Sequence, residues 1–281
     1  MILLDGKLTA KKHREQIAEE VRLLKERGVT PGLAVVIVGG DPASRMYVNN
    51  KEKDCAQCGI YSEEHALSDD CEQERLLQLI GNLNRREDIH GILVQLPLPK
   101  HLNEKEILLS IDPSKDVDAF HPYNVGRIMI GDYDFLPCTP AGVMALLDEY
   151  NISVQGKECV VVGRSNIVGK PMAMLLLHRH GTVTICHSRT RDLAAATRRA
   201  DILVAAAGQA GLITGDMIKE GSAVIDVAMN KNAEGKFVGD VVFDEAAEKA
   251  AYLTPVPGGV GPMTRVMLLR NTVKAAERAC V

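Results

Sequence analysis

Residues 159–171 read Cys-Val-Val-Val-Gly-Arg-Ser-Asn-Ile-Val-Gly-Lys-Pro, and this stretch decides the fold. Its first four residues are apolar and mostly β-branched, which is typical of a strand buried on both faces. Gly163 ends the strand, and Gly169 with Pro171 predicts a helix start. Such a strand–turn–helix unit directs backbone N–H groups toward an anion, above all a phosphate. We interpret it as a dinucleotide pyrophosphate site, although a glycine turn of any α/β protein fits the same local pattern.

Two stricter phosphate-binding motifs do not match this stretch. A G-x-G-x-x-G fingerprint requires a second glycine where Ser165 stands. A G-x-x-x-x-G-K-[ST] loop requires glycine at Arg164 and Ser or Thr at Pro171. The second mismatch argues against a nucleoside triphosphatase.

The chain after residue 150 alternates strands and helices. Strands are predicted at 159–162, 182–187, 201–206 and 222–227, and helices at 168–179, 190–199 and 214–220. This alternation is typical of βαβ units, which form a parallel sheet with helices on both faces. In such folds the turn after the first strand holds the dinucleotide pyrophosphate.

The end of the second predicted strand indicates which dinucleotide binds. NAD sites place an acid there for the ribose 2′-hydroxyl, but the run His187-Ser-Arg-Thr190 contains none before Asp192. Arg164 and Arg189 are placed to flank a 2′-phosphate, with Ser188 as a hydrogen-bond donor. The sequence therefore favours NADP over NAD.

The first half carries a polar stripe on a predicted helix. Helices are predicted at 7–27, 42–58 and 72–86, and strands at 33–38 and 91–96. Ser44, Tyr47 and Lys51 have the spacing of one helix face. A solvated face would explain them, but this helix follows the carboxyl end of a strand, where open α/β sheets bind ligands.

Two further polar residues are expected near the same sheet edge. Gln95 is the only polar residue in the run Gly-Ile-Leu-Val-Gln-Leu at 91–96, so it needs partners, either in backbone loops or on a ligand. Asp118 begins a loop that we expect to reach residue 137, and its apolar neighbours predict partial burial, although loop acids are usually solvated or capping groups. A helix from Thr139 to Tyr150 marks the predicted domain junction.

A loop rich in glycine and proline precedes the last predicted helix, 263–279. Residues 254–264 read Thr-Pro-Val-Pro-Gly-Gly-Val-Gly-Pro-Met-Thr. Its backbone is stiff yet free of bulky side chains, so a ligand can approach the main chain closely. A rigid turn without a ligand would fit this loop equally well.

Composition limits the classes of protein. The chain has 281 residues, 46% apolar and 25% charged, with a net charge of −4, which is ordinary for a globular protein and suggests neither nucleic-acid nor membrane binding. The first residues lack the pattern of a signal peptide. Seven cysteines, unevenly spaced, fit reduced thiols in a cytoplasmic protein. Cys55 and Cys58 fall late in a helix without a second pair nearby, so we interpret them as packing residues and predict no metal site.

Six motifs in combination resemble one family. The chain is similar to bifunctional methylenetetrahydrofolate dehydrogenase/methenyltetrahydrofolate cyclohydrolases over almost its whole length. The motifs lie at residues 47–51, 91–99, 115–118, 137–140, 163–171 and 255–264. The Gly-Arg-Ser stretch and the last motif are the most diagnostic.

The resemblance implies an α/β protein with two domains and a cleft between them. Residues 1–137 with 263–281 would form a folate-binding catalytic domain, and 138–262 a Rossmann-like NADP-binding domain. The implied reaction oxidises 5,10-methylenetetrahydrofolate with NADP and then hydrolyses the methenyl product to 10-formyltetrahydrofolate. This would place a cytoplasmic homodimer in one-carbon metabolism and purine biosynthesis, with tetrahydrofolates as substrates.

The resemblance also assigns roles to residues. Lys51, Tyr47, Gln95 and Asp118 match catalytic positions. Substrate contacts would come from Ser44, Tyr47, Lys51, Val94, Gln95, Leu96, Asp118, Pro257, Gly258, Gly259, Val260 and Gly261. Cofactor contacts would come from Gly163, Arg164, Ser165, Ser188 and Met229.

The chain departs from the family pattern at a few positions, and other functions remain open. Ala119 and Ala228 stand where glycine is frequent, and Gln209-Ala210 replaces a frequent Lys-Pro. A monofunctional dehydrogenase would not need Lys51 and Gln95, and a non-catalytic NADP sensor would not need the stripe on the second helix. A shikimate-type dehydrogenase would share the architecture without the motif at 255–264.

Overall fold

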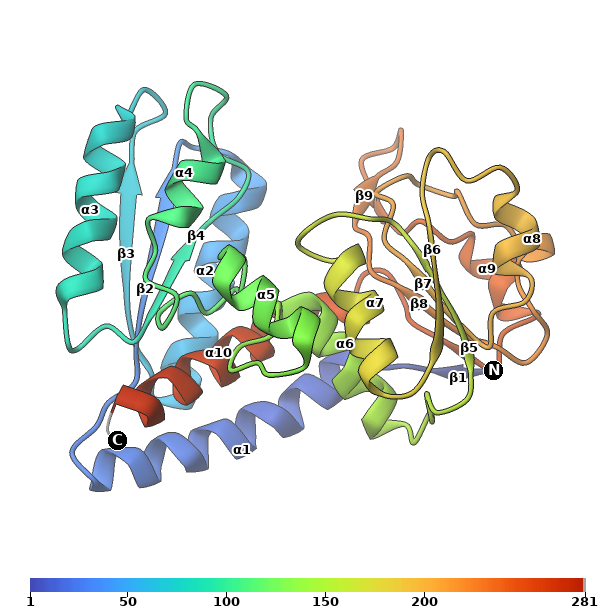
Figure 1. The fold of residues 1–281 in the computed structure, drawn as a ribbon, viewed down its shortest axis with the longest axis horizontal. Helices are drawn as coiled ribbons and strands as arrows, with labels where there is room; N and C mark the ends of the chain where they lie inside the picture. The colour runs from blue at the N-terminus through green and yellow to red at the C-terminus, as the bar shows by residue number, and fades with distance from the viewer. Residues whose placement is uncertain (280–281) are drawn as a thin grey trace. The chain divides into compact units, whose positions relative to one another are not determined.

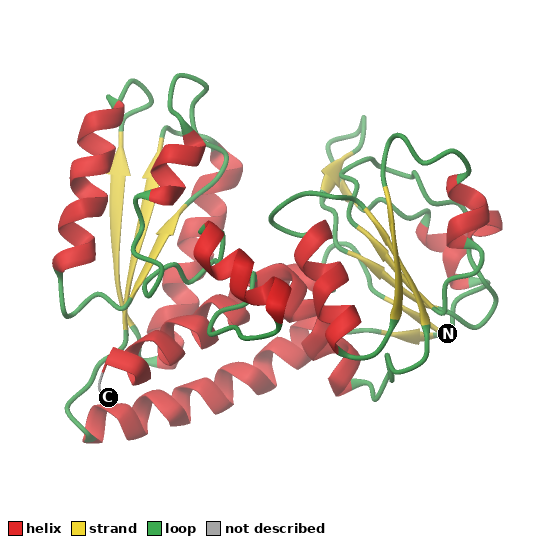
Figure 2. Cartoon of the chain, in the orientation of Figure 1, coloured by secondary structure: helices red, strands yellow, loops and turns green. Residues whose placement is uncertain are grey.

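The computed structural model describes residues 1–279. The chain forms two compact units (Figures 1 and 2): Met1–Lys11 with Pro137–Thr264, and Lys12–Leu136 with Arg265–Val281. Helices α1 (Gly6–Glu26) and α10 (Val260–Ala279) contribute residues to both units. None of the helices in residues 1–279 is long and apolar enough to cross a membrane.

The unit of Lys12–Leu136 is built on a three-stranded parallel sheet in the order β3-β2-β4. The strands are β2 (Gly32–Val38), β3 (Tyr61–Leu67) and β4 (Gly91–Val94). β2 is buried along its whole length because it has a neighbour on each side. The chain steps from β2 to β3 on one side and then to β4 on the other. The strand order therefore reverses between β2 and β4, and open α/β sheets bind ligands beyond the carboxyl ends of strands at such a point.

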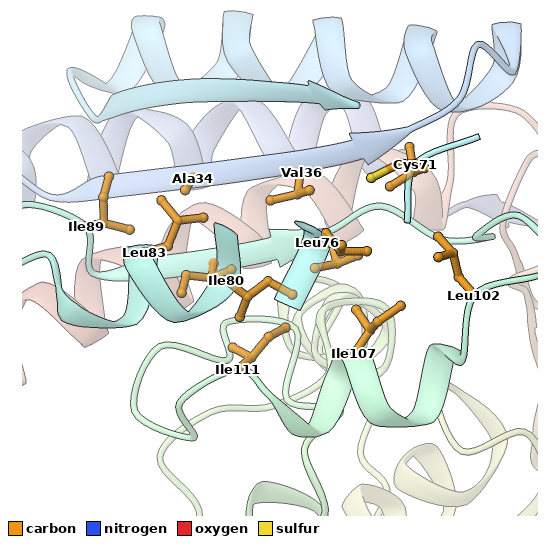
Figure 3. Packing of buried hydrophobic residues seen from close by; sticks show 13 residues of the cluster. Ala34, Val36, Cys71, Leu76, Ile80, Leu83, Ile89, Leu102, Ile107 and Ile111 are labelled. Atoms are coloured by element: carbon orange, nitrogen blue, oxygen red, sulfur yellow. The ribbon is translucent and has the colours of Figure 1, made fainter. Parts of the chain in front are cut away.

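Helices α2 (Pro42–Cys58), α3 (Gln73–Arg85), α4 (Glu104–Leu109) and α5 (Pro122–Ile130) belong to the same unit. Helix α3 packs on the sheet through regularly spaced apolar residues. In α3, Leu76, Ile80 and Leu83 follow the spacing of one helix face and meet Val36 of β2 and Ile107 of α4 (Figure 3). Helix α2 contacts both β2 and β3, so the sheet positions the residues that α2 carries.

The other unit holds a six-stranded parallel sheet in the order β1-β11-β8-β7-β5-β6. The strands are β1 (Ile2–Leu3), β5 (Glu158–Val162), β6 (Thr182–Cys186), β7 (Ile202–Ala205), β8 (Ala223–Asp226) and β11 (Tyr252–Leu253). From β5 the chain moves to β6 on one side and to β7 on the other. The switch point of this sheet therefore lies beyond β5 and β7.

Short helices and one hairpin complete this unit. The helical segments are α6 (Cys138–Glu149), α7 (Gly169–His178), α8 (Leu193–Thr197), the 3₁₀ turn η1 (Gly215–Met217) and α9 (Phe243–Ala247). Strands β9 (Asn230–Lys231) and β10 (Phe237–Val238) pair antiparallel. Alternate residues of β5 and β7, such as Val160 and Leu203, form a core with Ile213, Ile218 and Ala246. The two-domain α/β fold predicted from the sequence is confirmed.

Several elements differ from the prediction. Strand β3 was not predicted because its interior, Ser-Glu-Glu-His, is polar, as an edge strand with exposed positions allows. Helix α5 was expected to be loop because proline and glycine stand at its ends, where they act as helix start and C-cap. The expected helix at 214–220 is only the turn η1, and α10 begins at Val260 rather than at 263.

The first residues lie in a different unit from the one predicted. β1 pairs with β11, with Ile2 opposite Tyr252 and Leu3 opposite Leu253. Residues 1–11 therefore pack with 137–264, and not with the predicted domain of 1–137. Two residues are too short for a strand pattern, so only the pairing reveals this element.

We expect the stability of the Lys12–Leu136 unit to depend on His90. Its Nδ1 accepts the Gly32 N–H at 3.1 Å, and the residue is only 8% exposed. Burial, helped by the charge of Lys115, lowers the pKa of His90 below 6.5, so the unfolded chain takes up a proton first. The contribution of His90 to the free energy of unfolding is therefore fully present above pH 6.5. It is lost as the pH falls below 6.5, by at most about 1.4 kcal/mol per pH unit.

Urea denaturation at pH 7.5 and 5.5 tests this expectation. The comparison is His90→Asn, whose side-chain oxygen can accept the same N–H but does not titrate. Wild type should lose stability relative to the variant over this range. Parallel pH profiles for the two proteins would contradict the role assigned to His90.

Candidate functional site

Lys51 and Gln95 meet at the switch point of the three-stranded sheet. Asp41 caps α2 by accepting the Ser44 N–H at 2.8 Å, which fixes the helix start just after β2. The Gln95 N–H donates to Val36 O at 2.8 Å, which holds Gln95 at the end of β4. Lys51 Nζ then donates to Gln95 Oε1 at 2.9 Å. The structure thus joins two residues that the sequence placed at one sheet edge.

The Gln95 amide has a defined orientation. Its Nε2 donates to Leu96 O at 2.6 Å, so its oxygen is directed to Lys51. An amide oxygen accepts a hydrogen bond from either the neutral or the charged form of an amine. Gln95 therefore orients Lys51 without the fixed negative charge that a carboxylate would bring.

Other predicted residues of this unit lie on the same helix, α2, and on β4. Tyr47 lies one turn before Lys51 on α2 and is half-buried, whereas Ser44 and Val94 are buried. Burial raises the pKa of Tyr47, partly offset by the charge of Arg265. The phenol is therefore protonated at neutral pH and can donate a hydrogen bond.

Asp118 lies in a loop that is organised around a buried neighbour. Asp116 pairs with Ile92 beside β4, and its carboxylate accepts N–H groups from Phe120 at 3.2 Å and His121 at 2.8 Å. The Asn124 side chain donates to it as well, at 2.8 Å. Burial raises the pKa of Asp116, while these donors lower it. The loop thereby wraps Asp116 and leaves Asp118 half-buried.

Helix α10 holds the other side of this loop. Asn271 Nδ2 donates to Val117 O at 2.7 Å and to Leu136 O at 2.8 Å. The family pattern suggested that Ala119 would shift this loop, and Ala119 has φ 57°, a left-handed conformation that disfavours residues with a Cβ. Asp116 and Asn271 were not predicted as site residues. Asn271 gave no signal in the sequence, because its neighbours Arg270 and Thr272 are polar as well.

We expect Asn271→Ala to destabilise the protein by about 1–3 kcal/mol, because it leaves two backbone carbonyls without their donor. Urea denaturation measures the change. The matched control is Asn82→Ala on α3, where the side chain is exposed and accepts from Arg85; its effect should stay within about 0.5 kcal/mol. Equal losses in both variants would show that Asn271 does not hold the loop.

The glycine turn lies at the switch point of the six-stranded sheet. Gly163 follows β5 with φ 137°, and a Cβ on it would lie 2.2 Å from Ala206 O, just beyond β7. A Cβ on Gly169 would lie 2.3 Å from Gly163 O. The two glycines therefore let the turn, the first turn of α7 and the loop after β7 pack together.

Ser165 lies in the turn just before helix α7, whose N-cap residue is Val168. The Ser165 Oγ accepts the N–H groups of Val168 at 3.1 Å and Gly169 at 3.2 Å. We expected the N–H groups at this helix start to be open to a phosphate, but these two are satisfied within the chain. Arg164 and Ser165 are themselves exposed, so a phosphate here would meet the guanidinium and the hydroxyl proton.

The end of β6 presents basic and hydroxyl groups. A turn from His187 to Thr190, closed by the Thr190 N–H on His187 O at 2.8 Å, leaves Ser188 and Arg189 exposed. Asp192 accepts the Ala195 N–H at 2.8 Å and so serves as the N-cap of α8. The first acid after β6 is thus engaged by a helix. This arrangement fits the 2′-phosphate of NADP.

The loop at 257–261 is close-packed backbone. Gly258 has φ 113°, and a Cβ on Gly259 would lie 2.7 Å from Pro255 O. Val260 and Gly261 already belong to α10. Met229 lies elsewhere, in the loop after β8, and is exposed.

Cys55 and Cys58 are packing residues, as the sequence analysis predicted. Both are buried in α2, and burial raises the pKa of Cys55 to about 12 and that of Cys58 to about 11. A redox dithiol needs a lowered thiol pKa. Cys280 lies outside the described residues.

Two family models match the chain. Residues 4–118 match "Tetrahydrofolate dehydrogenase/cyclohydrolase, catalytic domain", and residues 137–280 match the "NAD(P)-binding domain" of the same family. The chain belongs to the tetrahydrofolate dehydrogenase/cyclohydrolase family. The predicted family and its class of bifunctional enzyme are confirmed.

Similar proteins agree with this assignment. The chain is 61% identical to "Bifunctional protein FolD" of Moorella thermoacetica, over 98% of the chain and 99% of the relative. The Campylobacter jejuni bifunctional FolD structure is 51% identical, with TM-score 0.97 and 99% coverage of both chains. The Trypanosoma brucei enzyme, complexed with NADP and an inhibitor, is 42% identical with TM-score 0.96, over 100% of this chain and 98% of that one. The NAD(P)-binding domain and this complex confirm the predicted cofactor, NADP.

A shikimate dehydrogenase from Aquifex aeolicus shares only the fold. Its structure is 14% identical with a TM-score of 0.54, over 90% of this chain and 98% of that one. A shikimate-type dehydrogenase therefore has a similar architecture but a dissimilar sequence.

Proposed function

We propose that the chain oxidises 5,10-methylenetetrahydrofolate with NADP⁺ and then hydrolyses 5,10-methenyltetrahydrofolate to 10-formyltetrahydrofolate, with the catalytic roles given below. The observation that carries this proposal is the hydrogen bond from Lys51 Nζ to Gln95 Oε1 at the switch point. It presents an oriented amine where open α/β sheets bind ligands. A sensor without catalysis would need no such amine.

The first step depends on positioning. When bound, NADP⁺ accepts a hydride from the methylene carbon of the folate, which becomes the methenyl cation. In our proposal Tyr47 packs on the pterin side, and Asp118 offers carboxylate oxygens to the N–H groups of the pterin amide edge. Loop residues 116–124 keep Asp118 in place through the Asp116 carboxylate.

The second step needs proton transfer. Water attacks the methenyl carbon and gives a proton to the Lys51 amine, and the same lysine returns it to the ring nitrogen as the carbon–nitrogen bond breaks. The proton left on the added hydroxyl is released to solvent as the formyl carbonyl forms. The cationic substrate beside Lys51 disfavours its ammonium form, which makes the neutral amine available as a base. Gln95 holds that amine by the hydrogen bond described above.

We expect Lys51→Met to reduce cyclohydrolase activity by about 10²–10⁴-fold, because it removes the proton-transfer group. The decay of added methenyltetrahydrofolate measures this step without NADP. Lys53→Met is the matched control, since Lys53 is exposed on the same helix. Full cyclohydrolase activity in Lys51→Met would refute the assignment.

The choice of NADP is proposed to rest on positive charge. Arg164 follows β5 and Arg189 follows β6, neighbouring strands of the sheet, and both are exposed. A guanidinium binds a phosphate through paired hydrogen bonds, and the Ser188 hydroxyl is available to donate another. Ser165 accepts two N–H groups, so its own O–H proton is left for a phosphate oxygen.

Arg164→Ala should raise the dissociation constant for NADP about tenfold or more while that for NAD changes little, because one charge-assisted contact is worth about 1.5–3 kcal/mol. Fluorescence titration with each reduced cofactor gives the ratio. The control is Arg199→Ala, whose side chain pairs with Glu158 at the opposite end of β5. An unchanged preference in Arg164→Ala would remove the phosphate role.

One assay separates the remaining alternatives. Purified protein is given methylenetetrahydrofolate with NADP⁺ or NAD⁺, and both the reduced cofactor and the methenyl product are followed. Reduction with a persistent methenyl product would indicate a monofunctional dehydrogenase. No reduction with either cofactor would indicate a sensor.

We also propose a cytoplasmic homodimer, from the family resemblance. Light scattering at the mass of one 30.5 kDa chain would contradict the dimer.

A further inference from the structure

Asp240 gathers four N–H donors in the interior of the unit that carries the six-stranded sheet. Its side chain is fully buried. Oδ2 accepts the backbone N–H groups of Ala207 at 2.6 Å and Gly208 at 3.0 Å. Oδ1 accepts the Gln209 N–H at 2.7 Å and the Asn230 Nδ2 at 3.0 Å. One carboxylate therefore fixes three consecutive amides of the loop after β7 and one side chain from the loop after β8.

A second buried carboxylate holds Asp240 itself. Asp226, the last residue of β8, accepts the N–H groups of Asp240 at 3.1 Å, Val241 at 2.8 Å and Ala228 at 3.2 Å. Burial raises the pKa of Asp226 to about 6, with these amides working against the rise. A Cβ on Gly239 would lie 1.9 Å from Asp226 Oδ2, so glycine is required for the approach. Asp226 thus holds the backbone at Asp240, and the Asp240 side chain in turn holds the loop after β7.

The supported loops leave the sheet at its ligand-binding edge. Strands β7 and β8 are neighbours, and loops 207–209 and 227–230 begin at their carboxyl ends. Met229 stands between two anchored residues, because the Ala228 N–H donates to Asp226 and the Asn230 side chain donates to Asp240. Its backbone is thus held from both sides, although Met229 itself is exposed.

We propose that Asp240, supported by Asp226, is a positioning residue that fixes loops 207–209 and 227–230 around the nicotinamide end of the cofactor. This inference rests on the proposed function and on the family resemblance, which matches Met229 to a position whose backbone meets the nicotinamide end of the cofactor. Asp240 acts through the loops and does not itself touch the cofactor. Since carboxyl ends of strands at a switch point bind ligands, the placement of these two loops determines how the reacting ring is held.

Only a carboxylate satisfies this site. Both of its oxygens accept, whereas an asparagine of nearly the same shape has one acceptor and one NH₂ donor. In Asp240→Asn the NH₂ group must face either the Ala207 and Gly208 amides or the Gln209 amide and Asn230. The NH₂ group then faces other N–H donors, and the hydrogen bonds on that side of residue 240 are lost.

The test uses the whole protein and measures NADPH affinity directly by fluorescence, so it does not depend on turnover. Asp240→Asn should raise the NADPH dissociation constant about tenfold to a hundredfold, since at least two charge-assisted bonds are lost. Dehydrogenase kcat/KM should fall with it. Cyclohydrolase activity on added methenyltetrahydrofolate should stay within about twofold, because that step needs no cofactor.

Asp201→Asn is the matched control. Asp201 also accepts a backbone N–H, from Glu158 at 2.9 Å, and pairs with Lys219 at 2.6 Å. It lies at the opposite, amino end of the same sheet, so NADPH affinity should be unchanged. Asn230→Ala is a milder second variant that removes one donor and should raise the dissociation constant about threefold to tenfold.

Three results would overturn the inference. Unchanged NADPH affinity in Asp240→Asn is the first. Equal loss of both activities in a folded variant is the second, because it indicates a general structural role. If Asp240→Asn does not fold, unchanged affinity in Asn230→Ala is the third. A wild type that binds NADPH without dehydrogenase activity would refute the proposed function alone, while the affinity comparison would still decide the role of Asp240.

Discussion

The three-stranded and six-stranded sheets of this protein are parallel, each reverses its strand order at one internal strand, and the candidate sites depend on that constraint. Parallel strands need crossover connections. Where the chain continues to the left of one strand and then to its right, the loops at the carboxyl ends of the adjacent strands leave the sheet in opposite directions. In the three-stranded sheet the reversal lies between β2 and β4, which brings Lys51 next to Gln95. In the six-stranded sheet it lies between β5 and β7, which brings Gly163 against Ala206. Residues distant in sequence thus become neighbours through topology.

The loops at these edges have backbone N–H groups that no strand can pair, and buried carboxylates supply the missing acceptors. Asp116 serves the loop of Asp118, and Asp240 with Asp226 serves the loops after β7 and β8. Burying a carboxylate is costly, but hydrogen bonds to a charged group contribute about 1.5–3 kcal/mol each, and each of these groups receives three or four. These hydrogen bonds hold the loops at the ends of the strands.

The sequence predicted the elements whose pattern is local. The apolar run of β5 and the Asp-Pro start of α2 were found almost to the residue. Strand β3 escaped because its residues are polar and only its pairing with β2 defines it. The hydrogen bonds of Ser165 at the start of α7 and of Asp240 to the loop after β7 were not predicted for a related reason. Their partners are backbone N–H groups, which every residue except proline has, so no pattern of residue types indicates these hydrogen bonds. The function came from six motifs in combination, since each motif alone fits an ordinary loop or helix face.

The placement of acids also differs between the two ends of the proposed cofactor site. At the end of β6 the first acid, Asp192, is directed into the start of α8, and the exposed groups are Arg189 and Ser188. At the ends of β7 and β8 the acids are buried and fully engaged by amides. At the end of β6 the exposed Asp192 carboxylate is engaged by a helix N–H, whereas the buried carboxylates order loops inside the unit. An exposed arginine contributes little while water surrounds it, so the phosphate end provides selectivity chiefly once a ligand covers it. The interior carboxylates act before any ligand arrives, because their hydrogen bonds already hold the loops in place.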